Sequence, residues 1–263
     1  MRLKLATWNV NSVRLRLKGL ARLAAEASPD VICLQETKVT DEAFPLHACR
    51  ELGYPHILIR GQKSYNGVAI LSRLALEEGE ARRWCGRADS RHLIARLDPG
   101  IELHNFYVPS GGDVPDPKLN EKFAHKLDFL AEMTACFEKR PAKRLILVGD
   151  LNVAPLETDV WSHKQLLKVV SHTPVEVEAL ARLARSQGWI DVVRRFIPPE
   201  EKLFSWWSYR ARNWETSDRG RRLDHIWVTP ALEDALSGAC VLKPARGWDT
   251  PSDHVPVIAT LEV

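Results

Sequence analysis

Cysteine is scarce in this 263-residue sequence and shows no pairing pattern. The cysteines are Cys33, Cys49, Cys85, Cys136 and Cys240, and no two of them form a CxxC pair. Three of them sit in apolar segments, as buried thiols usually do. An odd, scattered set argues against a disulfide framework and against a cysteine zinc site, and it favours a reducing compartment.

Long apolar runs are missing as well. The first apolar stretch, Leu3 to Trp8, reaches Asn9 too early for the hydrophobic part of a signal peptide. No run is long enough to cross a bilayer. We therefore expect a cytoplasmic protein that does not enter a membrane.

Linkers, low-complexity segments and internal repeats are also lacking. The loop richest in proline and glycine, residues 108–118, has predicted core strands on both sides. This favours a single domain over residues 1–263. Nothing in the sequence marks an oligomer interface, so a monomer is the default expectation.

Net charge is small, at +3, which is weak evidence for a polyanionic partner. If several carboxylates are gathered in one metal site, however, the basic residues must lie outside that site. The sequence is therefore compatible with an acidic pocket inside a basic surround.

Periodicity predicts a mixture of strands and helices. Short apolar runs predict buried strands at 3–8, 31–34, 68–71, 93–97, 101–107, 145–148, 223–228 and 255–261. Helical spacing predicts helices at 17–27, 119–138 and 174–187, the last with Thr173 as its N-cap. Hairpins such as the one predicted at Pro99-Gly100, mixed with helices, favour an α/β protein with mixed or antiparallel sheets.

Four of these strands run into acidic or amide residues. The strand ends carry Asn9 and Asn11, Gln35-Glu36, Asn105 with Tyr107, and Asp150-Leu151-Asn152. Rigid scaffolds present functional groups at such places. Oxygen ligands of this kind suit Mg²⁺ or Mn²⁺, and Glu36 with Asp253 or Asp150 would supply the carboxylates.

Ser252-Asp253-His254 adds a histidine directly before a strand. His254 can act as a base near neutral pH or donate to a phosphate. A histidine in that role needs an acceptor to orient it, and Asp224 is a candidate.

Each of these residues also has a simpler interpretation. Asn9, Asn11 and Asn105, taken singly, are turn residues by odds of roughly two to one. Glu36 could be a solvated charge, Gly149-Asp150 a simple turn, Tyr107 half-buried core, and Asp224-His225 a surface pair.

The order of the motifs carries a family resemblance. The blocks are Thr7-Trp8-Asn9-Val10-Asn11, Leu34-Gln35-Glu36-Thr37-Lys38, Asn105-Phe106-Tyr107-Val108-Pro109, Gly149-Asp150-Leu151-Asn152, Phe204-Ser205-Trp206-Trp207, Arg222-Leu223-Asp224-His225 and Ser252-Asp253-His254. Together they resemble the exonuclease III family of abasic-site endonucleases, within the endonuclease/exonuclease/phosphatase superfamily. The resemblance extends from about Leu3 to Leu261. It favours the functional interpretation for Glu36, Asp150, Asn152, Asp224, Asp253 and His254.

The resemblance implies a fold and a set of roles. The fold is a four-layered α/β sandwich of the DNase I type, with two central mixed sheets flanked by helices. Glu36 is the implied principal metal ligand, and the implied metal set is Asn9, Glu36, Asp150, Asn152, Asp253 and His254. The implied catalytic residues are Tyr107, Asp150, Asn152, Asp224 and His254, with the base role open between Asp150 and His254. Tyr107 would stabilise the leaving oxygen or orient the phosphate.

The resemblance also implies how DNA is held. Trp206 and Leu223 would wall a pocket for an extrahelical abasic sugar, and Asn11 would contact substrate. Arg221 departs from relatives that carry an aromatic residue there, and Trp248 is a candidate substitute stack. Ser110, where many relatives have asparagine, is a second departure. The candidate DNA-contacting cations are Arg14, Arg16, Lys38, Lys63, Arg210, Arg212, Arg219, Arg221, Arg222 and Arg246, of which we expect about a third to touch DNA.

Other histidines and tryptophans lack functional spacing. We expect surface or core positions for His47, His92, His104, His125, His163 and His172, and core positions for Trp84, Trp161, Trp189 and Trp227.

The function predicted from the sequence is a Mg²⁺-dependent DNA repair hydrolase that cleaves duplex DNA 5′ to abasic sites and trims 3′ ends. Mn²⁺ is a plausible replacement for Mg²⁺. The alternatives are a superfamily phosphodiesterase acting on RNA or another phosphate ester, and a DNA-binding module whose metal site has decayed.

Overall fold

The strands form two central sheets. The computed structural model describes residues 1–141, 143–211 and 213–263. The first sheet contains β1 (Arg2–Asn9), β2 (Val31–Gln35), β3 (His56–Arg60), β4 (Val68–Ser72), β13 (Leu236–Val241) and β14 (Val257–Glu262). The second contains β5 (Leu76–Glu78), β6 (His92–Leu97), β7 (Ile101–Tyr107), β8 (Leu145–Asp150), β9 (Ile190–Asp191) and β12 (Asp224–Val228). A small ladder joins β10 (Trp206–Trp207) to β11 (Gly220–Arg221).

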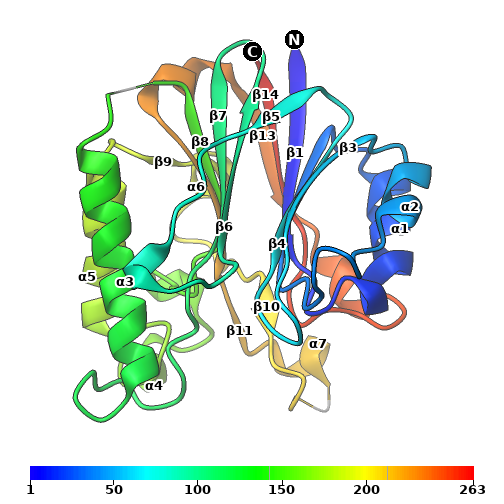
Figure 1. Ribbon diagram of the computed structural model, residues 1–263. Helices are drawn as coiled ribbons and strands as arrows, with labels where there is room; N and C mark the ends of the chain where they lie inside the picture. The colour runs from blue at the N-terminus through cyan, green and yellow to red at the C-terminus, as the bar shows by residue number, and fades with distance from the viewer. Residues whose placement is uncertain (142, 212) are drawn as a thin grey trace.

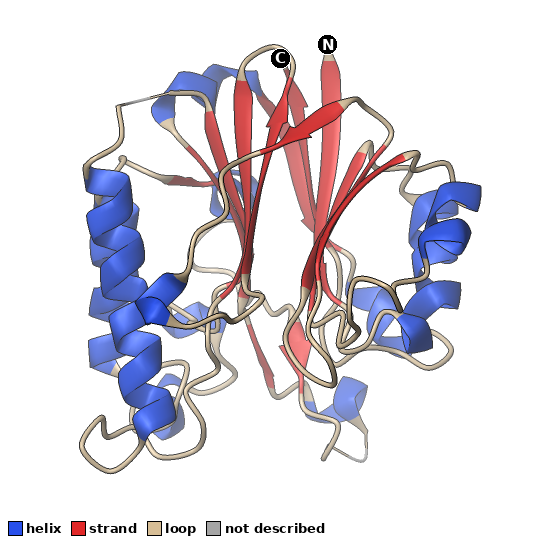
Figure 2. Ribbon diagram, in the orientation of Figure 1, coloured by secondary structure: helices blue, strands red, loops and turns tan. Residues whose placement is uncertain are grey.

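The longer helices lie outside the two sheets (Figures 1 and 2). The α-helices are α1 (Leu17–Glu26), α2 (Leu46–Glu51), α3 (Glu121–Glu138), α4 (His163–Leu166), α5 (Pro174–Arg185), α6 (Val192–Phe196) and α7 (Trp214–Ser217). The short 3₁₀ helices are η1 (Arg14–Arg16), η2 (Trp84–Gly86), η3 (Glu157–Asp159), η4 (Pro230–Ala235) and η5 (Lys243–Gly247). In Figure 1, α1 and α2 cover one side of the sandwich and α3 and α5 cover the other.

Both sheets are mixed. Their strand orders are β13-β14-β1-β2-β4-β3 and β5-β6-β7-β8-β12-β9 within the described residues. The pairs β1–β2 and β7–β8 are parallel, and the remaining pairs are antiparallel. Two central mixed sheets between outer helices are the four-layered sandwich that the resemblance implied.

Central strands are buried on both faces, which explains their apolar sequences. In β1, Leu3 and Leu5 join the core between the sheets, whereas Ala6 and Trp8 face the helix layer that contains α1. Successive side chains of a strand point to opposite faces, so one strand serves two cores. Among the described residues, we find no helix with the length and apolarity needed to cross a membrane.

Capping residues determine where the two longest helices begin. The side chain of Thr173 accepts a hydrogen bond from the Glu176 amide, and Pro174 opens α5 as predicted. The long helix begins at Glu121 rather than Leu119, because Asn120 caps it by accepting from the Lys122 amide.

Near one edge, the interface between the sheets becomes polar. Asn105 in β7 is fully buried, and its side-chain amide donates to the carbonyls of Leu34 and Ala69 in the first sheet, both at 3.0 Å. Gln35 donates to Asn105 Oδ1 at 2.7 Å. The interpretation of Asn105 as a turn residue is therefore wrong: buried backbone carbonyls require donors, and Asn105 supplies them across the sheets.

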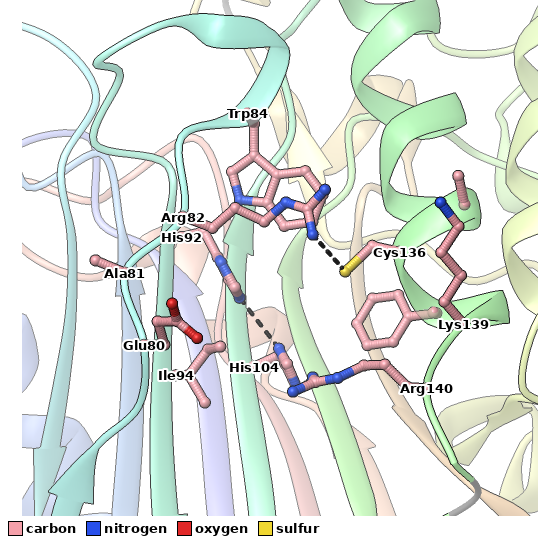
Figure 3. Close-up of a pocket in the computed structure, with 12 residues that line it drawn as sticks. Glu80, Ala81, Arg82, Trp84, His92, Ile94, His104, Cys136, Lys139 and Arg140 are labelled. Carbon is pink, nitrogen blue, oxygen red and sulfur yellow. Dashed lines mark hydrogen bonds between the residues drawn. The ribbon is translucent and has the colours of Figure 1, made fainter.

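A cavity of about 430 Å³ lies between the outer face of β6 and β7 and the end of α3 (Figure 3). His92 and His104 share a hydrogen bond of 3.1 Å at its base. His104 Nε2 also forms a hydrogen bond of 2.8 Å with Glu102 Oε1. Arg140 forms an ion pair with the same carboxylate oxygen at 2.6 Å. These histidines are buried and packed around Phe106, as expected for core histidines. The network fastens the segment that follows α3 to the sheet.

Asp150 is brought close to β7 by a glycine. Gly149 in β8 has φ +138°, and a Cβ there would lie 1.9 Å from the Phe106 carbonyl oxygen. No side chain fits between these parallel strands. The motif Gly149-Asp150 is therefore a strand end and not a turn.

We predict that Gly149→Ala destabilises the fold, because the new methyl must force β7 and β8 apart. The cost from overpacking alone is about 1–3 kcal/mol, and the backbone conformation adds to it. Urea unfolding measures the change. Gly238→Ala is the matched control, since a Cβ at Gly238 meets nothing within 4 Å; equal effects at both positions would contradict the packing argument.

The Glu102 network predicts a pH-dependent contribution to stability. The hydrogen bond from His104 lowers the pKa of Glu102 to about 2, against the effect of burial and with help from Arg140. This folded-state pKa is below the ordinary value of 4.5, so the stabilisation is complete above pH 4.5 and is lost as pH falls toward 2.

We expect wild type to be more stable than Glu102→Gln at neutral pH, with the difference shrinking from about pH 4.5 downward. Urea unfolding at a series of pH values measures it. Glu77→Gln, at an exposed site on edge strand β5 of the same sheet, is the control. A difference that grows on acidification would refute the assignment.

Candidate active site

Residues from both sheets surround a cavity of about 730 Å³, which we call the acid-lined cavity. The predicted catalytic, metal-binding and pocket residues that line it are Glu36, Tyr107, Asp150, Asn152, Trp206, Arg221, Leu223, Asp253 and His254. They come from segments far apart in the chain, so the cavity exists only in the folded protein.

Strand direction explains why these residues meet. Parallel pairing places Asn9 beside Gln35 in the first sheet and Tyr107 beside Asp150 in the second. Antiparallel β12 starts at Asp224 directly opposite Asp150. The carboxyl ends of the central strands therefore reach one edge of the sandwich together.

Glu36 is a fixed, ionised carboxylate. It accepts from Asn9 Nδ2 at 2.8 Å and from the Tyr107 hydroxyl at 2.9 Å, and Lys38 Nζ lies 2.7 Å away. Burial opposes ionisation, but Lys38 and the Asn9 hydrogen bond outweigh it and lower the pKa of Glu36. Its backbone has φ +52°, an uncommon conformation for glutamate that turns the chain sharply after β2.

Asp150 has the opposite electrostatic setting. It is buried and accepts from Asn9 Nδ2 and from the Asn152 backbone amide, both at 2.9 Å. Burial raises the pKa of Asp150, and the carboxylates of Asp224 and Glu36 raise it further. A proton therefore binds Asp150 more readily than it binds an ordinary aspartate.

The predicted pairing of Asp224 with His254 is present. His254 Nδ1 lies 2.8 Å from Asp224 Oδ2, and Ser205 donates to the same oxygen at 2.6 Å. Burial lowers the pKa of His254, but the carboxylates of Asp224 and Asp150 outweigh it and raise the pKa above its ordinary value. The second ring nitrogen, Nε2, lies 3.7 Å from Asp150 Oδ2, beyond hydrogen-bond distance.

Glu36, Asp150 and His254 can share a metal ion. Each offers one ligand atom, and these three atoms lie within 4.8 Å of one another. Two carboxylate oxygens and an imidazole nitrogen fit a divalent cation. Asp253 lies outside this trio: its oxygens accept from Asn11 Nδ2 at 3.0 Å and from Trp206 Nε1 at 2.9 Å.

The amides at the cavity have different positions. Asn9 ends β1 and donates to both Glu36 and Asp150, while its Oδ1 accepts from the Asn11 amide at 3.0 Å. The interpretation of Asn9 as a turn residue is therefore wrong. Asn11 does lie in a turn, with φ +43°. Asn152 donates to the Val108 carbonyl at 2.9 Å.

An arginine–tryptophan wall closes one side of the acid-lined cavity. The Arg221 guanidinium lies 5.2 Å from the centre of the Trp206 ring, and Nη1 donates to Val170 O at 2.9 Å and to Ser171 Oγ at 2.8 Å. Arg219 lies over Trp161 in the same way, at 4.8 Å. The expectation that Trp161 is a core residue is wrong, since it is half-buried and lines the cavity.

Trp248 is not brought to the acid-lined cavity. It is buried, packs edge-on against Trp8 at 6.1 Å and is covered by Arg22. Trp84, Trp189 and Trp227 are buried as expected.

Cations surround the acidic centre. Arg210, Arg219 and Arg221 line the acid-lined cavity itself. An adjoining cavity of about 360 Å³ shares Glu36, Tyr107 and Ser110 with it and adds Lys38, Arg87, Arg91 and Lys122. This arrangement matches the expected acidic pocket in a basic surround.

Several predicted DNA-contacting cations are not available at the surface. Arg222 is buried and bonded to Asp159 at 2.8 Å and to Asp191 at 2.6 Å, so the expectation of DNA contact is wrong for it. Arg16 and Arg246 are also mostly buried. Arg14 and Lys63 are exposed, and Arg212 lies outside the described residues.

Comparison with known proteins agrees with this geometry. The pattern of the endonuclease/exonuclease/phosphatase family matches residues 6–254. Exodeoxyribonuclease III of Haemophilus influenzae is 32% identical, over 98% of this chain and 99% of that protein. An AP endonuclease structure from Archaeoglobus fulgidus has a TM-score of 0.91 at 32% identity, covering 99% of this chain and all of that one.

A further structure, the 3′ phosphatase NExo from Neisseria bound to a product DNA hairpin, has a TM-score of 0.90 at 31% identity. It covers 99% of this chain and 100% of that one. The chain therefore belongs to the endonuclease/exonuclease/phosphatase family and, within it, to the exodeoxyribonuclease III group of phosphodiester hydrolases.

Proposed function

We propose that the chain is a Mg²⁺-dependent DNA repair hydrolase that cleaves duplex DNA 5′ to abasic sites and trims 3′ ends. The observation that carries the proposal is the meeting of Glu36, Asp150 and the Asp224–His254 pair on one cavity. The relatives described as exodeoxyribonuclease III, AP endonuclease and 3′ phosphatase support it.

Glu36 would be the principal metal ligand, with Asp150 nearest to it and Asn152 and Asp253 completing the set. His254 Nε2 lies within reach, but it would not coordinate while it carries the proton that Asp224 and Asp150 stabilise. Asn9 turns its N–H groups toward both carboxylates and would hold these ligands in place. When bound, the cation would withdraw negative charge from the phosphoryl oxygens. Its preference for oxygen ligands favours Mg²⁺, and Mn²⁺ would fit the same donors.

Asp150 would accept a proton from the attacking water. Its raised pKa brings it closer to neutral pH, where a base transfers protons efficiently. The Asn152 amide would hold the water or an oxygen of the transition state. His254 suits this base role less well, because Asp224 and Asp150 stabilise its protonated form.

His254 would donate through Nε2 to the scissile phosphate, since Nδ1 is occupied by Asp224. Tyr107 would orient the phosphate or stabilise the leaving 3′ oxygen. Burial raises the pKa of Tyr107 well above its ordinary value, and Glu36 and Asp150 raise it further, so it remains a donor.

Trp206 and Leu223 would wall the pocket for an extrahelical sugar, with Arg221 fixed against Trp206 and Asn11 contacting substrate. An abasic nucleotide costs less to extrude than a paired one. The surrounding cations would contact phosphates and make binding salt-dependent. The core shared by the two sheets supports one domain over residues 1–263, and we propose that it acts as a monomer.

We predict Mg²⁺-dependent cutting of a duplex that carries one tetrahydrofuran site. Asp150→Asn should lower kcat by about 10²–10⁴-fold, because it removes the proposed base while preserving the shape of the side chain. Gel-resolved cleavage measures this.

Parallel reactions on a blunt duplex, a 3′-phosphate end and an RNA duplex give the specificity. Preference for RNA would favour the alternative substrate class. An Asp150→Asn enzyme as active as wild type would refute the base assignment.

Metal removal gives a second prediction. EDTA should abolish cleavage and Mg²⁺ should restore it. Glu36→Gln should lower turnover and raise the Mg²⁺ concentration needed, while duplex affinity measured by fluorescence anisotropy changes little. Full activity of Glu36→Gln at low Mg²⁺ would show that Glu36 is not a ligand.

A further inference from the structure

A buried ion pair lies behind the wall of the acid-lined cavity. Lys126 on α3 and Glu176 on the first turn of α5 are bonded to each other, and both side chains are completely buried. Neither residue lines the cavity. Neither takes part in the proposed chemistry.

Lys126 joins three separate segments. An ammonium group has three N–H donors, and Lys126 directs them to Glu176, to Asn152 O at 2.7 Å and to Ser110 O at 3.3 Å. Asn152 and Ser110 both line the acid-lined cavity. The ammonium therefore holds two cavity loops from behind.

Glu176 holds a third segment. Its carboxylate accepts from the Ser171 amide at 2.9 Å, from the Thr173 amide at 3.1 Å and from the Thr173 hydroxyl at 2.6 Å. Ser171 has φ +87°, and its hydroxyl accepts from Arg221. This contact connects the ion pair to the arginine–tryptophan wall.

Close packing supports the same connection. Gly111 follows Ser110 with φ +89°, and a Cβ there would lie 2.9 Å from Lys126 Cδ. The loop therefore rests directly on the lysine stem, so movement of one moves the other.

Stability alone is a weak reason for such a pair. Burying two charges carries a desolvation cost that often cancels their attraction, and apolar replacements of both can be neutral. The particular acceptors are more informative, because the ammonium binds backbone carbonyls of two loops that face the cavity.

We propose that Lys126 and Glu176 are positioning residues: their ion pair clamps the loops at Ser110, Asn152 and Ser171 so that the Asn152 side chain keeps its place at the acid-lined cavity. This inference rests on the proposed function for its catalytic consequence. The clamp itself concerns how rigidly the loops are held, which hydrogen–deuterium exchange measures without reference to activity.

The test compares Lys126→Met with Met133→Ala. Met133 is a buried core residue on the same helix, so its truncation lowers stability without touching the loops. Both are assayed on the tetrahydrofuran duplex at a temperature where circular dichroism shows them folded. We expect Lys126→Met to lower kcat by about 10–100-fold with little change in KM, and Met133→Ala to leave kcat near wild type.

A double-mutant cycle locates the effect. In an Asn152→Ala background, Lys126→Met should cause little further loss, because its effect acts through Asn152. Unchanged kcat in Lys126→Met, or losses that simply multiply, would overturn the proposal. Should Lys126→Met fail to fold, Glu176→Gln, which keeps one of the two acceptor oxygens and removes the charge, is expected to lower kcat in the same direction.

Hydrogen–deuterium exchange tests the clamp without activity. Lys126→Met should speed exchange in segments 108–112, 151–153 and 170–173, whereas Met133→Ala should not. Unchanged exchange in these segments would refute the clamp. A wild-type protein that leaves all duplexes intact would contradict the proposed function instead.

Discussion

Asn9 holds the two sheets together at their acidic edge. Its side-chain amide donates to Glu36 from its own sheet and to Asp150 from the other. Two carboxylates placed this close repel each other unless donors or cations lie between them. Asn9 supplies one N–H group to each, and Lys38, Tyr107 and the imidazole ring add further donors and charge around them. The rest of the site depends on this arrangement.

The crowding of carboxylates at this edge also gives the acidic residues different pKa values. Glu36 lies beside a lysine and stays ionised, whereas Asp150 is buried near other carboxylates and binds a proton more readily. One carboxylate is therefore suited to hold a cation and the other to accept a proton. The clamp formed by Lys126 and Glu176 would preserve this division. Lys126 binds the carbonyl of Asn152, which lies only two residues after Asp150.

Much of the fold and the cluster could be predicted from the sequence, because apolar strands that end in polar residues converge wherever the strands run parallel. The long helices were also predictable from their spacing and caps. Contacts between side chains from distant segments were not: Asn105 bridges the sheets, Trp161 lines the cavity, Trp248 packs on Trp8, and Arg222 is buried by aspartates. The two-residue strands and single-turn helices carry no periodicity long enough to detect.

One cation is expected to bind where carboxylates of the two sheets meet. Diffraction from crystals soaked in Mn²⁺ tests it directly through the anomalous signal of the metal. We expect a peak within coordination distance of Glu36, on the side facing Asp150 and His254. A peak elsewhere, with none beside Glu36 at saturating Mn²⁺, would contradict it.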